Sequence, residues 1–232
     1  LQKKMRILIV AAMDKEKSLL LNLMKEHTTE DCEGISVNRG EIKGHDILLA
    51  KCGIGKVNSA LVTSKLIDRY KPELVINSGV AGGADETVKV GTVLAVDGAG
   101  YHDVWCGPGT QPGEADGFPL LFRPYEKGME IIKALQDSGE QIQTGIIATG
   151  DKFITTPEEI AAIKAVYPEA KACDMESASI AQACAWAKVP FMVIRVVSDT
   201  PGAADNLSQY QNFWSEAPEK TFHVLNQLLE RL

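Results

Sequence analysis

The sequence has too few residues of several kinds to support some common classes of protein. It contains five cysteines, an odd number with no C-x-x-C pair, and only four scattered histidines. Disulfide frameworks need paired cysteines and zinc sites need closely spaced ligands, so we expect a reduced, cytoplasmic protein without a bound metal. No apolar run reaches the ~18 to 20 residues of a membrane-spanning helix, so we expect no membrane partner. The cysteines are Cys32, Cys52, Cys106, Cys173 and Cys184.

Clustered positive charge is also missing. The 232 residues include 24 Lys and Arg against 31 Asp and Glu, a net charge of −7, with no basic cluster between aromatic residues. This balance argues against a nucleic-acid partner. Residues 77–83 are rich in glycine but follow neither the G-x-x-x-x-G-K-[ST] order of a P-loop nor the G-x-G-x-x-G order of a dinucleotide site. We therefore expect no nucleotide cofactor.

The chain does contain a regular alternation of strand-like and helix-like segments. Residues 34–41 and 46–52 flank a Lys43-Gly44 turn and predict an antiparallel hairpin, whereas the other apolar runs alternate with helical patterns. We therefore expect an α/β fold, with a central twisted mixed β-sheet flanked by helices. Residues 5–232 would form one domain. Residues 1–4 would be a remnant ahead of a natural start at Met5, or a disordered end.

The predicted boundaries follow from apolar spacing and from Gly and Pro positions. Strands are expected over residues 5–12, 34–41, 46–52, 74–77, 91–97, 141–149, 172–175 and 191–197. Helices are expected over residues 14–25, 56–70, 127–137, 157–166 and 176–186, and over a C-terminal stripe of Phe222, Leu225, Leu228, Leu229 and Leu232. Residues 78–83, 101–119 and 200–208 are expected to be turns or loops.

A single arginine in an apolar run is the most unusual feature of the sequence. Arg195 interrupts residues 191–197, a run typical of a strand buried on both faces, and Ser198-Asp199 follow it. A buried arginine keeps its charge and needs a carboxylate or a bound ligand as partner. The alternative is an arginine that reaches solvent at a strand end, with Asp199 capping the next turn.

Polar residues also follow three other predicted strands. Glu16 follows the first, the glycine-rich residues 77–83 follow another, and Asp174-Met175-Glu176 follow a third. Each has a plain structural interpretation, since acids favour helix N-termini and glycines favour tight turns. However, the carboxyl ends of parallel strands meet at one edge of a sheet, where α/β proteins bind ligands. The combination therefore favours one shared pocket.

Seven motifs of this chain, in the order in which they occur, resemble those of a known protein family. They are AAMDKE, CGIGKVNSA, INSGVAGGAD, VGTVLAVDGAGYHD, ATGDKFI, CDMESASIA and VIRVVSD. On these motifs the chain resembles the nucleoside phosphorylase/nucleosidase family, most of all its bacterial 5′-methylthioadenosine/S-adenosylhomocysteine nucleosidases, from Met5 to the C-terminal helix. The resemblance implies a hydrolase that needs no metal or cofactor and releases adenine and a 5-thioribose product from these two nucleosides.

The resemblance also implies catalytic roles. Glu16 would activate the attacking water, Arg195 would lie beside Glu16 as its ionic partner, and Asp199 would protonate N7 of adenine. Adenine is a poor leaving group as an anion, so an acid at N7 lets it leave as a neutral base. The cleavage would pass through an oxocarbenium-like state, with Glu16 ionised on the opposite face of the sugar.

The other expected contacts are with the substrate. Glu176 and Met175 would hold the ribose, Phe153 would stack on the base, and Tyr210 or Phe213 would cover the 5′ end. Ser198 would orient Asp199. The full set of expected substrate-binding residues is Met13, Ile54, Val80, Ala81, Gly82, Phe153, Ile154, Cys173, Met175, Glu176, Ser198 and Tyr210.

Water and phosphate are alternative nucleophiles in this family. Its phosphorylases carry an Arg and a Ser or Thr in the segment matching residues 77–80, where this chain has Asn77 and Val80. Without those donors a phosphate dianion lacks its charge-assisted hydrogen bonds, so we expect hydrolysis. Val80 also departs from the better-known nucleosidases, which have Ser there. The alternatives are futalosine hydrolysis, purine nucleoside phosphorolysis, or a non-catalytic module that binds adenine nucleosides.

A homodimer is the expected assembly. The resemblance implies that the loop from Tyr101 to Pro119 reaches the pocket of a second subunit. Trp105 and Pro108 are its candidate contacts, and their exposed apolar surface would otherwise be unfavourable in water.

Overall fold

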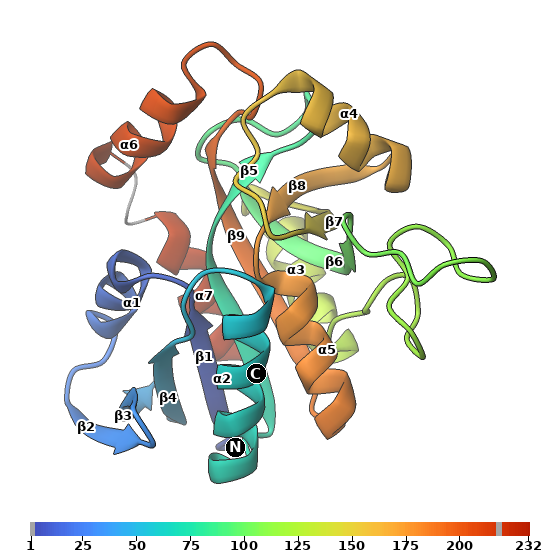
Figure 1. Cartoon of the computed structure of the whole chain (residues 1–232). Helices are drawn as coiled ribbons and strands as arrows, with labels where there is room; N and C mark the ends of the chain where they lie inside the picture. Colours follow the sequence, from blue (N-terminus) through green and yellow to red (C-terminus); the bar gives the residue numbers. More distant parts are fainter. Residues whose placement is uncertain (1–2, 217–219) are drawn as a thin grey trace.

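Helices cover both faces of one mixed β-sheet (Figure 1). The structure is a computed structural model and describes residues 3–216 and 220–232. Within these residues the strand order is β2-β3-β4-β1-β5-β8-β7-β6-β9, and β9 also pairs with β5. Strands β5 to β9 therefore close into a small barrel, and β1 to β4 extend the sheet. The predicted α/β fold with a mixed sheet is confirmed.

The strands and helices have the following bounds. The strands are β1 Arg6–Ala11, β2 His27–Cys32, β3 Ile35–Ile42, β4 His45–Lys51, β5 Leu74–Gly83, β6 Val93–Tyr101, β7 Ile142–Thr149, β8 Ala170–Asp174 and β9 Phe191–Asp199. The helices are α1 Asp14–Leu21, α2 Lys56–Tyr70, α3 Glu126–Asp137, α4 Pro157–Val166, α5 Ser177–Ala187, α6 Asn206–Glu216 and α7 Lys220–Arg231. None of the helices that the structure describes could cross a membrane.

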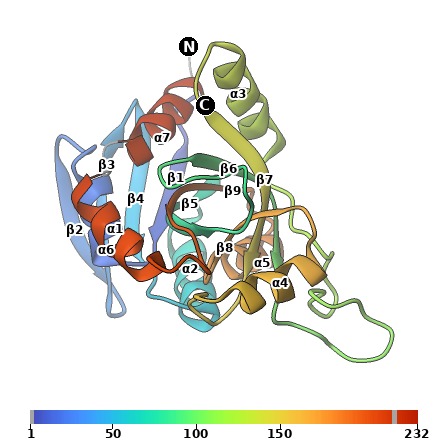
Figure 2. The ribbon, with the colours of Figure 1, turned by 90° about the horizontal axis from the view of Figure 1, so that it is seen from above.

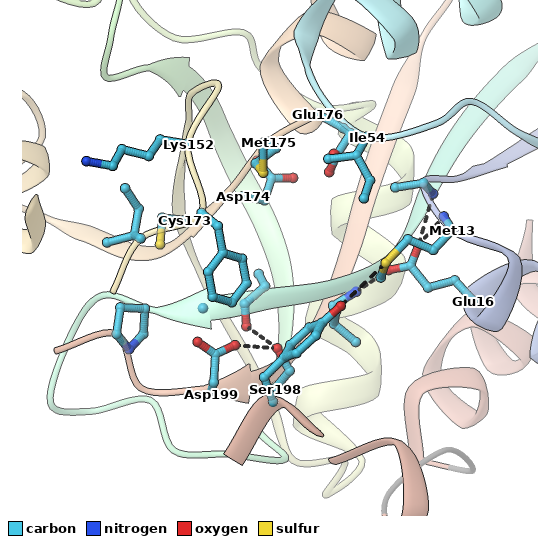
Figure 3. Close-up of a pocket in the computed structure, with 18 residues that line it drawn as sticks. Met13, Glu16, Ile54, Lys152, Cys173, Asp174, Met175, Glu176, Ser198 and Asp199 are labelled. Atoms are coloured by element: carbon cyan, nitrogen blue, oxygen red, sulfur yellow. Dashed lines mark hydrogen bonds between the residues drawn. The ribbon is translucent and has the colours of Figure 1, made fainter. Parts of the chain in front are cut away.

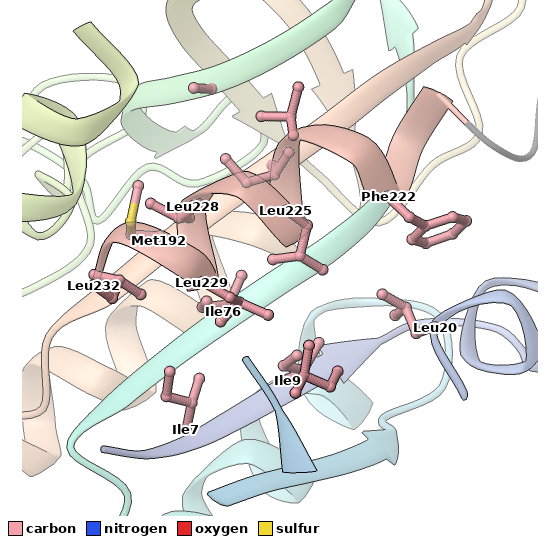
Figure 4. Close-up of a cluster of buried hydrophobic side chains, with 14 of the residues drawn as sticks. Ile7, Ile9, Leu20, Ile76, Met192, Phe222, Leu225, Leu228, Leu229 and Leu232 are labelled. Atoms are coloured by element: carbon pink, nitrogen blue, oxygen red, sulfur yellow. The ribbon is translucent and has the colours of Figure 1, made fainter. Parts of the chain in front are cut away.

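The hydrophobic core forms two layers because strand side chains alternate between the faces of the sheet. Ile7 and Ile9 of β1 pack in the cluster that contains the leucine stripe of α7, as Figure 4 shows. Leu8 and Val10 pack in the cluster on the opposite face, together with Leu66 of α2. Viewed from above, α2 and α5 lie on one side of the sheet and α3 and α7 on the other (Figure 2). The predicted C-terminal stripe is confirmed.

The glycine-rich residues 78–83 form a strand, so the predicted turn is wrong. β5 continues to Gly83 because β9 runs parallel to it from the Val75–Phe191 pair to the Gly82–Asp199 pair and supplies hydrogen bonds along its length. Glycine weakens an isolated strand but permits close approach of other groups. This extension places Val80, Ala81 and Gly82 beside the end of β9.

Two other elements differ from the sequence prediction. α6 begins at Asn206, inside the expected loop of residues 200–208. β2 was not predicted, because it is a polar and largely exposed edge strand that lacks the apolar alternation of a half-buried one. At the N-terminus, Lys3 pairs with Glu73 and Lys4 pairs with Glu41, so this part of the expected remnant contacts the fold. Residues 1–2 lie outside the described residues.

Candidate active site

A pocket lies where the carboxyl ends of β1, β5, β8 and β9 meet, the position at which α/β sheets bind ligands (Figure 3). Of the residues that the sequence predicted for the site, all except Arg195 and the alternative candidate Phe213 line this pocket. In the close-up, Asp199 and Glu16 lie at two ends of the pocket, and Glu176 lies on the wall that faces both of them. The shared pocket expected from the strand ends is therefore present.

Glu16 is a buried carboxylate held by backbone N–H groups. It lies in the first turn of α1, and its Oε2 accepts hydrogen bonds from the N–H groups of Ala12 (2.9 Å) and Met13 (3.1 Å). Its Oε1 accepts from the N–H of Val80 (2.9 Å). The residue lies at a helix start, but it is only 4% exposed and is therefore not a solvated surface acid. Burial raises the pKa of Glu16, whereas Arg195 and the three N–H donors act to lower it.

Arg195 is buried in the centre of β9, but its ionic partner differs from the expected one. Its Nη2 donates to Asp174 Oδ2 (2.7 Å) and to Ser177 Oγ (3.1 Å). Arg195 and Asp174 are both almost fully buried, which excludes the solvent-reaching alternative. The prediction that Glu16 forms the ion pair is wrong, because Asp174, at the end of β8, holds the guanidinium on the other side.

The side chains of Glu16 and Arg195 both approach the α-carbon of Gly79. A β-carbon at Gly79 would lie 2.7 Å from Arg195 Nη1 and would also collide with Glu16 Oε1. The two side-chain atoms are thus near neighbours without being an ion pair. In the described part of the chain, Arg195 Nη1 and Nε have no hydrogen-bond partner. Glycine at this position leaves the space that both side chains need.

Glu176 lies at the N-terminus of α5 and faces the pocket. Its Oε1 accepts from the N–H of Gly55 (3.0 Å), next to the start of α2. Burial and the nearby charge of Asp174 raise the pKa of Glu176 to about 7, against the opposing effects of Arg195 and the Gly55 N–H. Glu176 therefore keeps its proton to higher pH than an exposed glutamate does.

Asp199 ends β9 and is held on both oxygens. Ser198 Oγ donates to Oδ1 (2.6 Å), and Asn206 Nδ2 at the start of α6 donates to Oδ2. Burial raises the pKa of Asp199, and these two hydrogen bonds oppose the rise. A carboxyl group with a raised pKa carries a proton over a wider pH range than an exposed one. This property suits an acid more than a turn cap.

The apolar part of the pocket has aromatic and thioether side chains. Phe153 and Tyr210 meet edge to face, with ring centroids 5.4 Å apart, and the Tyr210 hydroxyl donates to Met13 Sδ (3.4 Å). Ile54 lines the same pocket and is 51% exposed. Of the two aromatic candidates for the 5′ end, both on α6, Tyr210 lines the pocket, whereas Phe213 is buried in the hydrophobic core.

Small residues form the wall between β5 and β8. A β-carbon at Gly82 would approach Pro201 to 2.7 Å and Cys173 Sγ to 3.3 Å, so this wall is tightly packed. Burial raises the pKa of the Cys173 thiol, which keeps it neutral. Ala81, Ile154 and Met175 also line the pocket. Ala81, Gly82 and the neutral Cys173 thiol are therefore uncharged parts of this wall.

Four pocket residues were not in the predicted set: Ala12, Lys152, Asp174 and Pro201. Asp174 had a usable signal, since it directly precedes Met175-Glu176 at a strand end. Asn206, which binds Asp199, had none, because the sequence predicted a loop there. In the described ranges no group of His, Cys, Asp or Glu side chains has an arrangement suited to a metal ion.

The arrangement agrees with comparisons to known proteins. The family model described as the phosphorylase superfamily matches residues 6–230. A 5′-methylthioadenosine/S-adenosylhomocysteine nucleosidase of Bacillus thuringiensis is 36% identical over 231 residues, covering 98% of this chain and 100% of that protein.

Solved structures of nucleosidases are also similar to this chain. An S-adenosylhomocysteine nucleosidase from Streptococcus pyogenes, in complex with 5-methylthiotubericidin, has a TM-score of 0.94 and 33% identity, covering 100% of this chain and 98% of that one. The futalosine hydrolase of Helicobacter pylori has a TM-score of 0.91 and 25% identity, with 98% of each chain covered. The chain therefore belongs to the phosphorylase superfamily and, within it, to the family of 5′-methylthioadenosine/S-adenosylhomocysteine nucleosidases.

Proposed function

We propose that this protein hydrolyses the N-glycosidic bond of 5′-methylthioadenosine and S-adenosylhomocysteine and releases adenine and a 5-thioribose product. One observation carries the proposal: two buried carboxyl groups, Glu16 at the start of α1 and Asp199 at the end of β9, face one pocket in a chain of this family. Their surroundings differ, since backbone N–H groups hold Glu16 and side chains hold Asp199. Two carboxyl groups in different surroundings can perform separate acid and base steps.

Asp199 is the proposed acid for the leaving group. As the bond between the anomeric carbon and N9 breaks, the electron pair moves onto adenine, and the Asp199 proton passes to N7. The burial that raises the pKa of Asp199 keeps it protonated over a wider pH range, and Ser198 and Asn206 fix its orientation. Adenine then leaves as a neutral molecule.

Glu16 is the proposed base for the water. The water oxygen bonds to the anomeric carbon as an oxocarbenium-like state develops, and one water proton passes to Glu16. The three N–H donors that hold Glu16 favour its ionised form and fix its position. Arg195 Nη1, close by across Gly79, is the proposed second contact of this water. The backbone N–H of Val80 fixes Glu16, so the proposed role of Glu16 as the base does not require a hydroxyl on the side chain of residue 80.

The remaining pocket residues suit the rest of the substrate. Glu176, when ionised, can accept hydrogen bonds from the ribose hydroxyls, with Met175 beside it. Phe153 and Ile154 offer a ring and an apolar contact for the base, and aromatic stacking on a base is typically worth about 1–3 kcal/mol. Tyr210 would cover the 5′ alkylthio group.

Water is the proposed nucleophile because the site opposes a phosphate dianion. The Val80 N–H already donates a hydrogen bond to Glu16. Asn77 is buried, and its Nδ2 donates to Ser177 Oγ (3.2 Å). Arg195 is already paired with Asp174. A dianion would therefore meet the negative charge of Glu16, while the charge of Arg195 is already offset by that of Asp174.

We also propose that two copies of the chain associate through the face formed by α2, α5 and the loop from Tyr101 to Pro119. Large apolar side chains are exposed there: Val57 (67%), Leu61 (66%), Trp105 (63%) and Trp186 (74%). Isolated exposed residues are common, but a group of this kind on one face favours a protein interface. The unpaired cysteines fit a reducing compartment, and we propose that the enzyme works in the cytoplasm.

The test is a release assay with four nucleosides: 5′-methylthioadenosine, S-adenosylhomocysteine, futalosine and inosine. We expect adenine from the first two with or without phosphate, and little base from the others. Futalosine as the preferred substrate would support the second candidate, which the structural similarity to the Helicobacter pylori enzyme favours. Binding without release from any of them would mean a non-catalytic module.

A further inference from the structure

Asp174 is the centre of a buried hydrogen-bond network that has no direct place in the proposed reaction steps. Its Oδ1 accepts from Thr149 Oγ1 (2.6 Å), and its Oδ2 accepts from Ser177 Oγ (2.5 Å) and from the Ser177 N–H (3.1 Å). Arg195 Nη2 donates to the same Oδ2 (2.7 Å). The side chain is 2% exposed, so these contacts replace water around the charge. The network fixes Asp174 from three elements: β7, α5 and β9.

The network also fixes which nitrogen of Arg195 lies beside Gly79 and Glu16. Nη2 is used by Asp174 and Ser177, whereas Nη1 lies beside Gly79, close to Glu16. If the Asp174 charge were absent, Arg195 would keep its own charge in a buried place. The remaining carboxylates that act on it are those of Glu16 and Glu176. Arg195 would then turn toward one of them.

We propose that Asp174 is a positioning residue that holds Arg195 by Nη2, so that Nη1 faces the water site and Glu16 stays free of an ion pair. The inference rests on the proposed hydrolysis, because it assigns Asp174 a task within that reaction. A Glu16 locked in an ion pair would be a poorer base, since the cation stabilises its deprotonated form. Ser177 shares the task, since its hydroxyl contacts both Asp174 and Arg195.

The main test is Asp174→Asn, compared with Asp174→Glu and Ser177→Ala. Asp174→Asn should lower kcat by about 10²-fold, the scale of loss for a misplaced catalytic group, with a much smaller change in KM. The acidic limb of its pH profile should move to lower pH, because Glu16 and Glu176 gain the Arg195 charge and Glu176 loses a negative neighbour. Asp174→Glu should recover part of kcat, and Ser177→Ala should lower kcat less than Asp174→Asn does.

Asp85→Asn is the matched control, since Asp85 pairs with Lys164 and Lys171 and does not line the pocket. It should leave kcat and the pH profile as in the wild type. If Asp174→Asn does not fold, Ser177→Ala carries the test, because it removes only a small hydroxyl.

Wild-type kcat and an unmoved acidic limb in Asp174→Asn would overturn the proposal. Where that variant does not fold, wild-type kcat in Ser177→Ala would overturn it. If the wild type itself released no base, the proposed function would fail instead. A crystal structure of Asp174→Asn would then decide the positioning role separately: the guanidinium turned toward Glu16 or Glu176 supports it, and an unmoved guanidinium overturns it.

Discussion

Glu16 and Arg195 meet beside the α-carbon of Gly79 without forming an ion pair. Glu16 Oε1 and Arg195 Nη1 both border the space that a β-carbon would fill, while Arg195 Nη2 is bonded to Asp174. Glu16 Oε1 can accept a hydrogen bond and Arg195 Nη1 can donate one. Because the two atoms border the same space without touching, one water molecule can bond to both, with each hydrogen bond spanning ~2.8 Å. The pair therefore forms a suitable holder for the proposed attacking water.

Gly79→Ala should disrupt this holder. The new methyl group would lie 2.7 Å from Arg195 Nη1 and would collide with Glu16 Oε1, so both side chains must move. We expect a fall in kcat of about 10²-fold, and a loss of stability of about 1–3 kcal/mol from overpacking. Gly98→Ala is the control, because its nearest neighbour is the flexible end of Arg123, and it should stay active. Steady-state kinetics and thermal unfolding check both results, and normal kinetics in Gly79→Ala would contradict the account.

Asp199→Asn should remove the proton donor for adenine while keeping the shape of the site. General acid catalysis typically contributes about 10²- to 10⁴-fold, so we expect a loss of kcat in this range with binding retained. Asp205→Asn, close along the chain but outside the pocket, should keep its activity. Base release measured against binding by calorimetry separates the two effects. If Asp199→Asn released adenine at the wild-type rate, the acid would have to be another group.

Glu16→Gln should give a protein that binds substrate without turning it over. The amide can still occupy the space of the carboxylate, but it cannot take a proton from water, so kcat should fall by about 10²-fold or more. Asp14→Asn serves as the matched variant, since Asp14 lies in the same helix turn and its side chain is 79% exposed. Single-turnover experiments with saturating enzyme would show the loss, and fast single turnover in Glu16→Gln would argue against the base assignment.

Glu176 should make the ligand-free protein less stable as pH rises. Its pKa is raised to about 7 in the fold, from an ordinary 4.5, so between these values the folded state holds more protons than the unfolded state. This group's contribution therefore falls over that window, by roughly 3 kcal/mol in full if each pKa unit is worth about 1.4 kcal/mol.

Glu176→Gln isolates this effect, because glutamine stays neutral. The stability of the wild type relative to Glu176→Gln should fall between pH 5 and about 7.5, as measured by urea unfolding at each pH. Parallel curves for the two proteins would show that Glu176 does not titrate in this window. The wild-type activity should rise over the same range, as Glu176 becomes able to accept the ribose hydroxyls.

Leu61→Glu should separate the two copies of the proposed dimer. Leu61 is exposed on α2 in the face that also holds Trp105 and Trp186, and a buried unpaired charge there is unfavourable. Leu207→Glu changes an equally apolar residue, 58% exposed on α6, and should leave the assembly unchanged. Sedimentation velocity distinguishes the outcomes. A wild type that sediments as a monomer would contradict the dimer.

Local patterns in the sequence predicted the fold class and the main carboxyl groups of the pocket, whereas the other pocket residues were predicted from the family resemblance. Apolar runs gave the strands, and polar residues after them gave Glu16, Glu176 and Asp199 as members of one site. The partner of Arg195 was harder to predict. The need for a carboxylate follows from a buried charge, but the choice between Glu16 and Asp174 depends on how β8 and β9 lie in the closed barrel, which no local pattern encodes.

The errors at residues 78–83 and 200–208 have a similar cause. The glycines of β5 form a strand because β9 pairs with them, and this tertiary pairing overrides the local preference for a turn. α6 starts at Asn206 in a segment with weak helical signals, and its docking beside β9 brings Asn206 to Asp199. Contacts between distant segments thus decided what the sequence pattern could not.

The most direct test of the central claim is the mass of the sugar product from 5′-methylthioadenosine in a buffer that contains phosphate. We predict free 5-methylthioribose together with adenine, and an unchanged rate when phosphate is removed, because Glu16 presents water to the anomeric carbon. A sugar 1-phosphate as the product, formed only when phosphate is present, would contradict the account.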